Sequence, residues 1–286
     1  MHIPVLCQAA LDYLAVHSGG VYLDATAGLG GHSAAIAQRL EAGMVIACDR
    51  DAESLEMCKR NTEQWAGRFR YRHGKFSELS SILSEYGIER VDGLVADLGS
   101  SRYQLTEAER GFSISANGPL DMRMDRTESQ TAAEIVNTTA EKALAELLYR
   151  LGQERRARKI ARAIVRARPI QSTLHLASVV ERVAPRTGRI HPATRTFMAL
   201  RMAVNDEQGQ LDRLLELAPE LVKAGGRIVI IAFMSLEDGK VKRSFQNLSR
   251  QGRARLLTKH VVRPTEEEIR TNPASRSARL RALEVI

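Results

Sequence analysis

Residues 22–33 read YLDATAGLGGHS, an apolar run that ends in Asp24 and continues into a glycine-rich loop. Such a loop after a strand predicts a nucleoside ligand, either a dinucleotide or an adenosine-bearing methyl donor. The dinucleotide fingerprint requires glycine at the first, third and sixth loop positions, and counting from Gly28 the sixth position is Ser33. The spacing from Asp24 to Gly30 instead approximates the loop of S-adenosylmethionine methyltransferases, where a Cβ would collide with the methionine portion. A plain tight turn is the alternative.

The sequence around this loop alternates between strand-like and helix-like periodicity, which is typical of βαβ units on a parallel sheet. Three strand-like runs end in an acidic residue, namely Asp24, Asp49 and Asp97. Because ligands bind at the carboxyl edge of open α/β sheets, these acids predict a site in which Asp49 accepts both ribose hydroxyls. The predicted strands are 21–25, 44–49, 69–73 and 91–97, and the predicted helices are 31–41, 51–65 and 77–86.

The periodicity changes after Asp97, and the next convincing strand is 227–233. A crossover between neighbouring parallel strands needs only a few tens of residues, so the long interval predicts an insertion. We therefore predict an α/β fold, a Rossmann-like class I sheet that binds S-adenosylmethionine (1–104 and 211–286) with an inserted all-helical substrate-recognition domain (105–210). Helical spacing covers 130–150, 153–168, 172–184 and 193–204 within the insertion. The return comprises a helix at 211–223, the strand 227–233, a helix near 237–250 and strands near 255–262 and 278–286.

The composition narrows the classes of protein to which the chain can belong. The 286 residues have an ordinary apolar fraction of 44%, and the net charge of +8 suits a polyanionic partner. Cys7, Cys48 and Cys58 form no CxxC pair and are expected to be reduced thiols, while the histidines lack metal-ligand spacing, so no metal is expected. The N-terminus lacks a leader pattern, and no apolar run reaches the ~20 residues of a membrane span. A soluble, cytoplasmic protein without membrane contact is expected.

Uncommon strings in fixed order run along the whole chain. They are HIPVL (2–6), GLGGHS (28–33), DRD (49–51), HGKFSEL (73–79), DLGSSRYQL (97–105), ERGFS (109–113), GPLDMRMD (118–125), KIARAIV (159–165), HPATRTF (191–197), GGRIVIIAFMSLED (225–238) and NPASRSARLR (272–281). On these strings the chain resembles the RsmH (MraW) family. Members of that family use S-adenosylmethionine to methylate N4 of a cytidine in 16S ribosomal RNA, at the decoding centre of the small subunit.

The resemblance implies a set of cofactor contacts. They are Gly30, Gly31, His32, Asp49, Phe76, Asp97 and Gln104. Phe76 would pack on the adenine face, and Asp97 would lie where the transferred methyl begins. Two alternatives stay open, since Phe76 could be an ordinary core residue and His32 could cap the following helix.

The chain also departs from the family pattern. Ser100 replaces a valine, Arg102 a serine and Thr106 an aspartate, while Met234 and Gly239 replace a histidine and an arginine. The register of the segment after Asp97 is unchanged, so we expect cofactor binding to persist. The reaction rate or the exact target position is more open to change.

Asp97 is the predicted catalytic residue. The methyl group leaves a sulfonium by in-line displacement, so the chemistry requires neither a metal nor a nucleophilic side chain. The lone pair of a cytosine amine is delocalised into the ring, and a carboxylate that accepts its N–H, with help from the Leu98 carbonyl, would aim that lone pair at the methyl. The target base must leave its stack to reach such a site.

Two segments of the insertion are candidates for contact with RNA. Along 150–168, arginines gather on one helical face and apolar residues on the other, which predicts either phosphate contact or a plain solvated face. In LDMRMD the charged side chains alternate with apolar ones and could face the cytosine, or could form a structural ion-pair loop. The tentative substrate contacts are Asp121, Arg123, Asp125 and Arg195.

Two rival functions remain open from the sequence. One is a methyltransferase of another RNA, a protein or a small molecule, with the insertion as a lid. The other is a non-catalytic ribosome-assembly factor that binds RNA, which loss of Asp49 or Asp97 would have favoured. A homodimer is a further possibility that the sequence does not decide.

Overall fold

The computed structural model describes residues 4–184 and 191–286, so the first two residues of the HIPVL string lie outside it. The chain forms two compact units. The boundaries fall between Gly99 and Ser100 and between Glu207 and Gln208, so the helical unit is an insertion in the sheet unit. These boundaries lie three to five residues earlier than those expected from the sequence.

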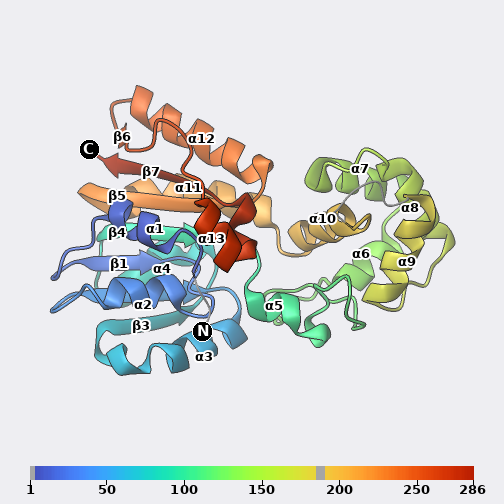
Figure 1. Cartoon of the computed structure of the whole chain (residues 1–286), viewed down its shortest axis with the longest axis horizontal. Helices are drawn as coiled ribbons and strands as arrows, with labels where there is room; N and C mark the ends of the chain where they lie inside the picture. The colour runs from blue at the N-terminus through green and yellow to red at the C-terminus, as the bar shows by residue number, and fades with distance from the viewer. Residues whose placement is uncertain (1–3, 185–190) are drawn as a thin grey trace. The chain divides into compact units, whose positions relative to one another are not determined.

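A seven-stranded sheet in the order β3-β2-β1-β4-β5-β7-β6 organises the first unit (Figure 1). Neighbouring strands from β3 to β5 are parallel, whereas β7 runs antiparallel to both β5 and β6. The carboxyl ends of β1, β2 and β4 therefore lie at one edge. The strands are β1 (Val21–Asp24), β2 (Met44–Asp49), β3 (Phe69–His73), β4 (Val91–Asp97), β5 (Val222–Ala232), β6 (Ala254–Leu256) and β7 (Arg279–Val285).

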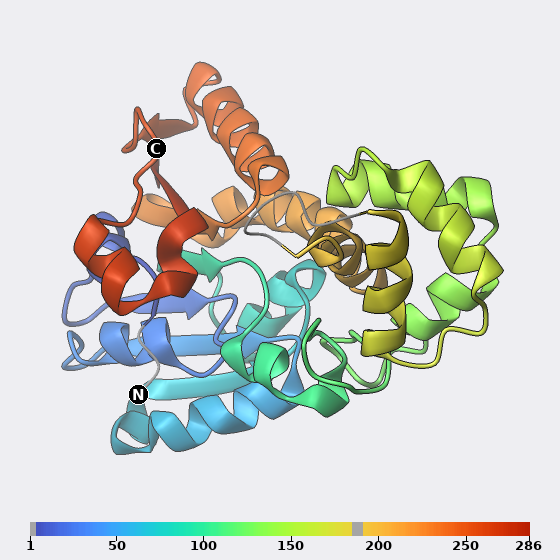
Figure 2. The same cartoon turned by 45° about the vertical axis from the view of Figure 1, so that its right-hand side comes forward.

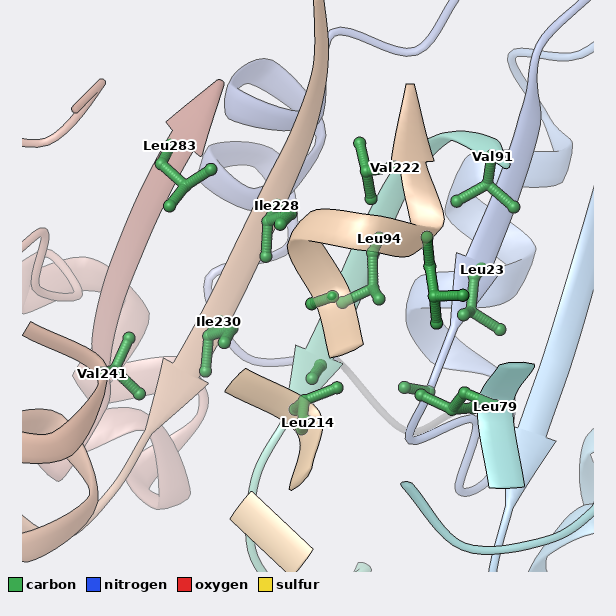
Figure 3. Packing of buried hydrophobic residues seen from close by; sticks show 14 of the residues in the cluster. Leu23, Leu79, Val91, Leu94, Leu214, Val222, Ile228, Ile230, Val241 and Leu283 are labelled. Carbon is green, nitrogen blue, oxygen red and sulfur yellow. The ribbon is translucent and has the colours of Figure 1, made fainter. Parts of the chain in front are cut away.

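Helices cover both faces of this sheet, which is why its central strands are apolar runs without alternation. Leu94, Ile228 and Ile230 pack against one layer of helices, as Figure 3 shows, and Val95 and Val229 on the opposite side pack against the other. The first layer is α4 (Leu79–Glu85), α11 (Glu207–Leu221) and α12 (Ser235–Arg250), and the second is α1 (Cys7–Leu14), α2 (Gly31–Ala37) and α3 (Ala52–Asn61). A short helix, α13 (Glu266–Thr271), precedes β7.

The second unit has its own apolar core, in which α7 packs on both α8 and α10 (Figures 1 and 2). On α8, Ala157, Ile160 and Ile164 are buried while the arginines face outward, as the sequence predicted. Its helices are α5 (Arg102–Thr106), α6 (Ala132–Thr138), α7 (Glu141–Gly152), α8 (Ala157–Arg166), α9 (Thr173–Val183) and α10 (Thr194–Val204). No helix in the described parts of the chain is both long enough and apolar enough to cross a membrane.

Two predicted elements are wrong in detail. The helix at 130–150 is two helices, because the backbone is extended at Thr139 and Ala140, where the side chain of Arg168 donates to the carbonyls of Val136 and Thr139 in place of a continuing helix. The late strand at 255–262 ends at Leu256, because the Thr258 hydroxyl accepts the N–H of Ala282 and disturbs the ladder.

The close packing of Gly118, in the loop before the helical core, allows the stability of the helical unit to be tested separately from that of the sheet unit. A Cβ on Gly118 would overlap the carbonyl oxygen of Ala108, so Gly118→Ala should destabilise the helical unit by at least about 2 kcal/mol. The melting of helices by circular dichroism should shift to lower temperature. Fluorescence of Trp65, the single tryptophan, reports the sheet unit and should shift little.

The matched control is Gly67→Ala, because a Cβ at Gly67 meets open space. A variant at Gly118 that melts like the control would contradict the packing described for this loop.

Candidate active site

The glycine loop after β1 is fastened by a buried carboxylate. Asp24 Oδ1 accepts the backbone N–H of Thr26 at 3.1 Å, and Oδ2 accepts the hydroxyl of Ser33 at 2.6 Å. Burial raises the pKa of Asp24, and these hydrogen bonds oppose the rise. Ser33 occupies the position where a dinucleotide loop has glycine, so the residue that breaks that fingerprint is the one that ties the loop to its strand. The hydrogen bond from Ser33 to Asp24 was not predicted from the sequence, although the serine follows the acid by nine residues.

The loop leaves no room for a side chain at Gly30 or Gly31. Gly30 has φ +88°, and a Cβ there would lie 2.9 Å from Cys58 Sγ on α3. A Cβ on Gly31 would lie 2.9 Å from the side chain of Pro4. The loop is therefore held between α3 and the N-terminal segment, and the glycines are required by packing as well as by access to a ligand.

Asp49 at the end of β2 supports the loop from the neighbouring strand. Its Oδ2 accepts the N–H of Gly28 at 2.7 Å and its Oδ1 accepts the N–H of Asp51 at 2.8 Å. Each oxygen retains a further lone pair for a ribose hydroxyl. Burial raises the pKa of Asp49 to about 6. Asp51 caps α3 by accepting the N–H groups of Glu53 and Ser54, so the two acids of the DRD string have separate tasks.

Asp97 at the end of β4 presents an unused acceptor. Its backbone N–H donates to Thr26 Oγ1 at 2.6 Å, and its Oδ2 lies 3.8 Å from His32 Nδ1. Its Oδ1 is buried and has no hydrogen-bond partner among the described residues. Burial raises the pKa of Asp97 to about 6. A buried acceptor without a donor is what a bound ligand would complete.

The charges at this edge suit a cation. Asp24 raises the pKa of both Asp49 and Asp97, because like charges in a poorly hydrated site disfavour ionisation. His32 opposes them and lowers the pKa of Asp24 and Asp97. A sulfonium nucleoside offers both a positive charge for the carboxylates and hydroxyl donors for Asp49. The residues present therefore fit S-adenosylmethionine.

His32 is buried and lies on α2, with Nε2 2.9 Å from the carbonyl oxygen of Val5. The ring therefore connects Asp97 to the N-terminal segment, and no bond to its own helix end is seen that would make it a cap. Phe76 is partly buried and packs against the core cluster of α4 and α11, in line with its reading as a core residue. Contact of Phe76 with adenine stays a prediction.

Gln104 belongs to the helical unit, where it is buried at the start of α5. Its Oε1 accepts the N–H of Ser101 at 3.0 Å, and its own N–H donates to Ser101 Oγ at 3.3 Å. This reciprocal pair is a capping box, which stabilises the first turn of α5. A cofactor contact by Gln104 stays a prediction.

The LDMRMD loop is held together internally. Arg123 donates to both oxygens of Asp121, at 2.7 and 2.8 Å, and to the carbonyl of Glu128 at 2.6 Å. Burial would raise the pKa of Asp121, but the hydrogen bonds from Arg123 outweigh it and lower the pKa. Asp125 accepts the N–H and the hydroxyl of Thr127. These contacts form a structural ion-pair loop, which is one of the two alternatives that the sequence allowed for LDMRMD.

Arg195 and Ser100 both make hydrogen bonds within the helical unit. Arg195 on α10 is exposed and donates to the carbonyl of Gln153 at 3.2 Å, so its contact with substrate stays a prediction. Ser100, a departure from the family pattern, accepts from Arg201 Nη1 at 3.0 Å, and Arg201 also holds both oxygens of Glu207. Within residues 4–184 and 191–286, no three His, Cys, Asp or Glu side chains gather as a metal site.

A sheet of this order, parallel from β3 to β5 and with an antiparallel β7, which carries a glycine loop and three acids at its carboxyl edge, defines a class I S-adenosylmethionine-dependent methyltransferase. The model of the MraW methylase family matches residues 1–286, and the chain belongs to this family.

Relatives match over the full length. A protein named ribosomal RNA small subunit methyltransferase H from Solibacter usitatus is 61% identical over 285 residues, covering 100% of both chains. A protein of the same name from Acidobacterium capsulatum is 48% identical, covering 99% of this chain and 98% of its own. Among solved structures, an rRNA methylase from Streptococcus thermophilus has a TM-score of 0.48 at 12% identity, covering 100% of this chain and 99% of its own.

The raised pKa of Asp97 gives a test of this edge. A carboxyl whose pKa rises on folding stabilises the protein fully below the unfolded value of 3.8, and that contribution is lost as the pH rises through about 6. Asp97→Asn removes the buried charge, so it should stabilise the ligand-free sheet unit by about 2 kcal/mol at pH 7.5. Near pH 4 the difference should shrink toward zero. Urea unfolding followed by Trp65 fluorescence measures the free energy of unfolding at both pH values. A variant less stable than the wild type at pH 7.5 would contradict the burial of a charged Asp97 carboxylate.

Proposed function

We propose that this protein transfers the methyl group of S-adenosylmethionine to the exocyclic N4 of a cytidine in small-subunit (16S) ribosomal RNA, at the decoding centre. The observation that carries the proposal is the buried, unpartnered Oδ1 of Asp97 at the carboxyl edge of the sheet. An acceptor in that place suits an amine N–H. Relatives named as small-subunit ribosomal RNA methyltransferases support the RNA as substrate.

The chemistry follows from this acceptor. S-adenosylmethionine supplies a methyl group made electrophilic by its sulfonium. Asp97 accepts one N–H of the cytosine amine, which turns the nitrogen lone pair toward the methyl. The lone pair forms the new N–C bond, the electrons of the S–C bond remain on sulfur, and the surplus amine proton goes to Asp97 Oδ1. With a pKa of about 6, Asp97 is mostly ionised at neutral pH and can take that proton.

The cofactor would be held by loop backbone and by acids at the strand ends. Asp49 would accept the ribose hydroxyls, and the glycines would let the methionine portion approach the backbone. The proposed cofactor residues are Gly30, Gly31, His32, Asp49, Phe76, Asp97 and Gln104. The insertion would recognise the substrate. A protein acting on ribosomal RNA during subunit assembly would work in the cytoplasm.

The outer face of α8, together with Arg155 in the turn just before it, is the surface we propose for RNA. Arg155, Arg158, Lys159 and Arg166 are exposed, and the described residues provide them with no anionic partner. Arg162 on the same face pairs with Glu141 at 3.4 Å. Cations whose charge is not neutralised within the protein release counterions when they meet phosphates, which strengthens binding without reading sequence.

The identity of the methylated nucleoside tests the proposed reaction. Nucleoside mass spectrometry of RNA from reacted small subunits should detect N4-methylcytidine. Asp97→Ala should lower turnover at least about 100-fold, because the amine loses its orienting acceptor, while RNA binding changes little. Methyl on cytosine C5, on ribose or on no RNA at all would overturn the proposal.

The α8 surface is tested by salt dependence. Replacing Arg155 and Arg158 with alanine should reduce the slope of log affinity against log salt concentration by about 1 per lost phosphate contact. Arg213→Ala is a matched control, because this exposed arginine of the sheet unit pairs with Glu216 at 2.9 Å. Equal slopes for the double variant and the control would remove α8 from the RNA interface.

A further inference from the structure

We propose that His32 is the positioning residue of Asp97, in that its Nδ1 holds the proton that keeps this carboxylate ionised and leaves Oδ1 open to the amine. The inference rests on the proposed function, because it assigns a partner to the acceptor of that reaction. It goes beyond a cofactor contact, since it gives the imidazole a task toward a protein side chain.

The tautomer of His32 is fixed by the backbone. Its Nε2 lies 2.9 Å from the carbonyl oxygen of Val5, and a carbonyl only accepts, so Nε2 must carry a hydrogen. In a neutral ring the other nitrogen, Nδ1, would then present a lone pair to Asp97 Oδ2 at 3.8 Å. Two acceptors facing each other repel. The arrangement is favourable when Nδ1 is protonated as well, as an imidazolium facing a carboxylate.

The pair lies where an ionic interaction is strong. The His32 side chain is 8% exposed and that of Asp97 is 24% exposed, so water screens their attraction less than at the surface. Two further carboxylates interact electrostatically with Asp97, Asp24 on β1 and Glu237 on α12, and both raise its pKa. His32 is the group that opposes them. Without it, Asp97 would hold a proton to higher pH and would accept one from the amine only above that pH.

The support behind His32 comes from both ends of the chain. The N–H of Leu6, the residue after Val5, donates to Glu268 Oε1 on α13 at 2.7 Å. Pro4 lies against Gly31 on the other side. The Val5 carbonyl is thus held in place from the glycine loop and from the C-terminal helix. Its bond with Nε2 keeps Nδ1 turned toward Asp97.

Two variants separate the nitrogens of the ring. The amide nitrogen of glutamine can occupy the place of Nε2 and keep the bond to Val5, whereas that of asparagine can occupy the place of Nδ1 and donate to Asp97. In His32→Gln the acidic limb of the rate–pH profile should move up by about 1 unit, because the carboxylate loses its cation. Its rate at pH 6 should fall about fivefold, because the ionised fraction of Asp97 falls from about one half to about one tenth, and it should recover by pH 8.5. His32→Asn should keep the limb closer to that of the wild type.

The same shift should be visible without RNA, by ¹³C NMR titration of the Asp97 carboxyl in the full chain. Affinity for S-adenosylmethionine by calorimetry reports the proposed cofactor contact of His32 separately, because loss of that contact lowers the rate at every pH, whereas loss of the cation moves the acidic limb. An Asp97 carboxyl that titrates alike in the wild type and His32→Gln would overturn the inference, as would a rate loss independent of pH. A product other than N4-methylcytidine would refute the proposed function, while the RNA-free titration would still report the pair.

Discussion

The bond between the buried Asp24 carboxylate and the two ends of the glycine loop is the constraint on which this site depends. Because Asp24 holds Thr26 and Ser33, the loop turns back over the sheet edge and directs the Gly28 N–H toward the carboxylate of Asp49. Thr26 in turn accepts the N–H of Asp97. The ends of three strands are thereby tied through one loop. A ligand that binds there meets acceptors whose positions are already fixed, so little of its binding energy goes into ordering them.

The burial of three carboxylates close together disfavours their ionised forms. Asp49 and Asp97 both have pKa values raised to about 6 by burial, and Asp24 raises them further. The ligand-free site therefore disfavours its own charged state. A cationic sulfonium relieves this repulsion, and the neutral thioether left after transfer does not. At the proposed cofactor site, the same carboxylates would therefore attract the charged cofactor and favour release of the neutral product.

The sequence predicted β1 to β4 to within one residue because each strand is an apolar run bounded by turns and acids. It failed where distant contacts decide. The predicted helix 130–150 is interrupted at Thr139 and Ala140, where Arg168 from a distant part of the chain bonds to the last carbonyls of α6, and nothing near Thr139 in the sequence signals that partner. The HIPVL string contains no sign of its support for His32, because the bond from Leu6 to Glu268 joins residues that are almost the whole chain apart. Periodicity reports which face is buried, not which groups meet.

The strings that carry the resemblance in the helical unit have mainly an architectural task. Arg110 of ERGFS is buried and donates to the carbonyls of Arg123 and Met124, and a Cβ on Gly118 would overlap the backbone of Ala108. Two strings thus pack into one loop, and each constrains the other. A match over them indicates the same loop fold, because changes there are excluded by sterics. In the function proposed here, the choice of target atom would be decided by different chemistry, at the sheet edge, where a donor would have to reach the free Oδ1 of Asp97.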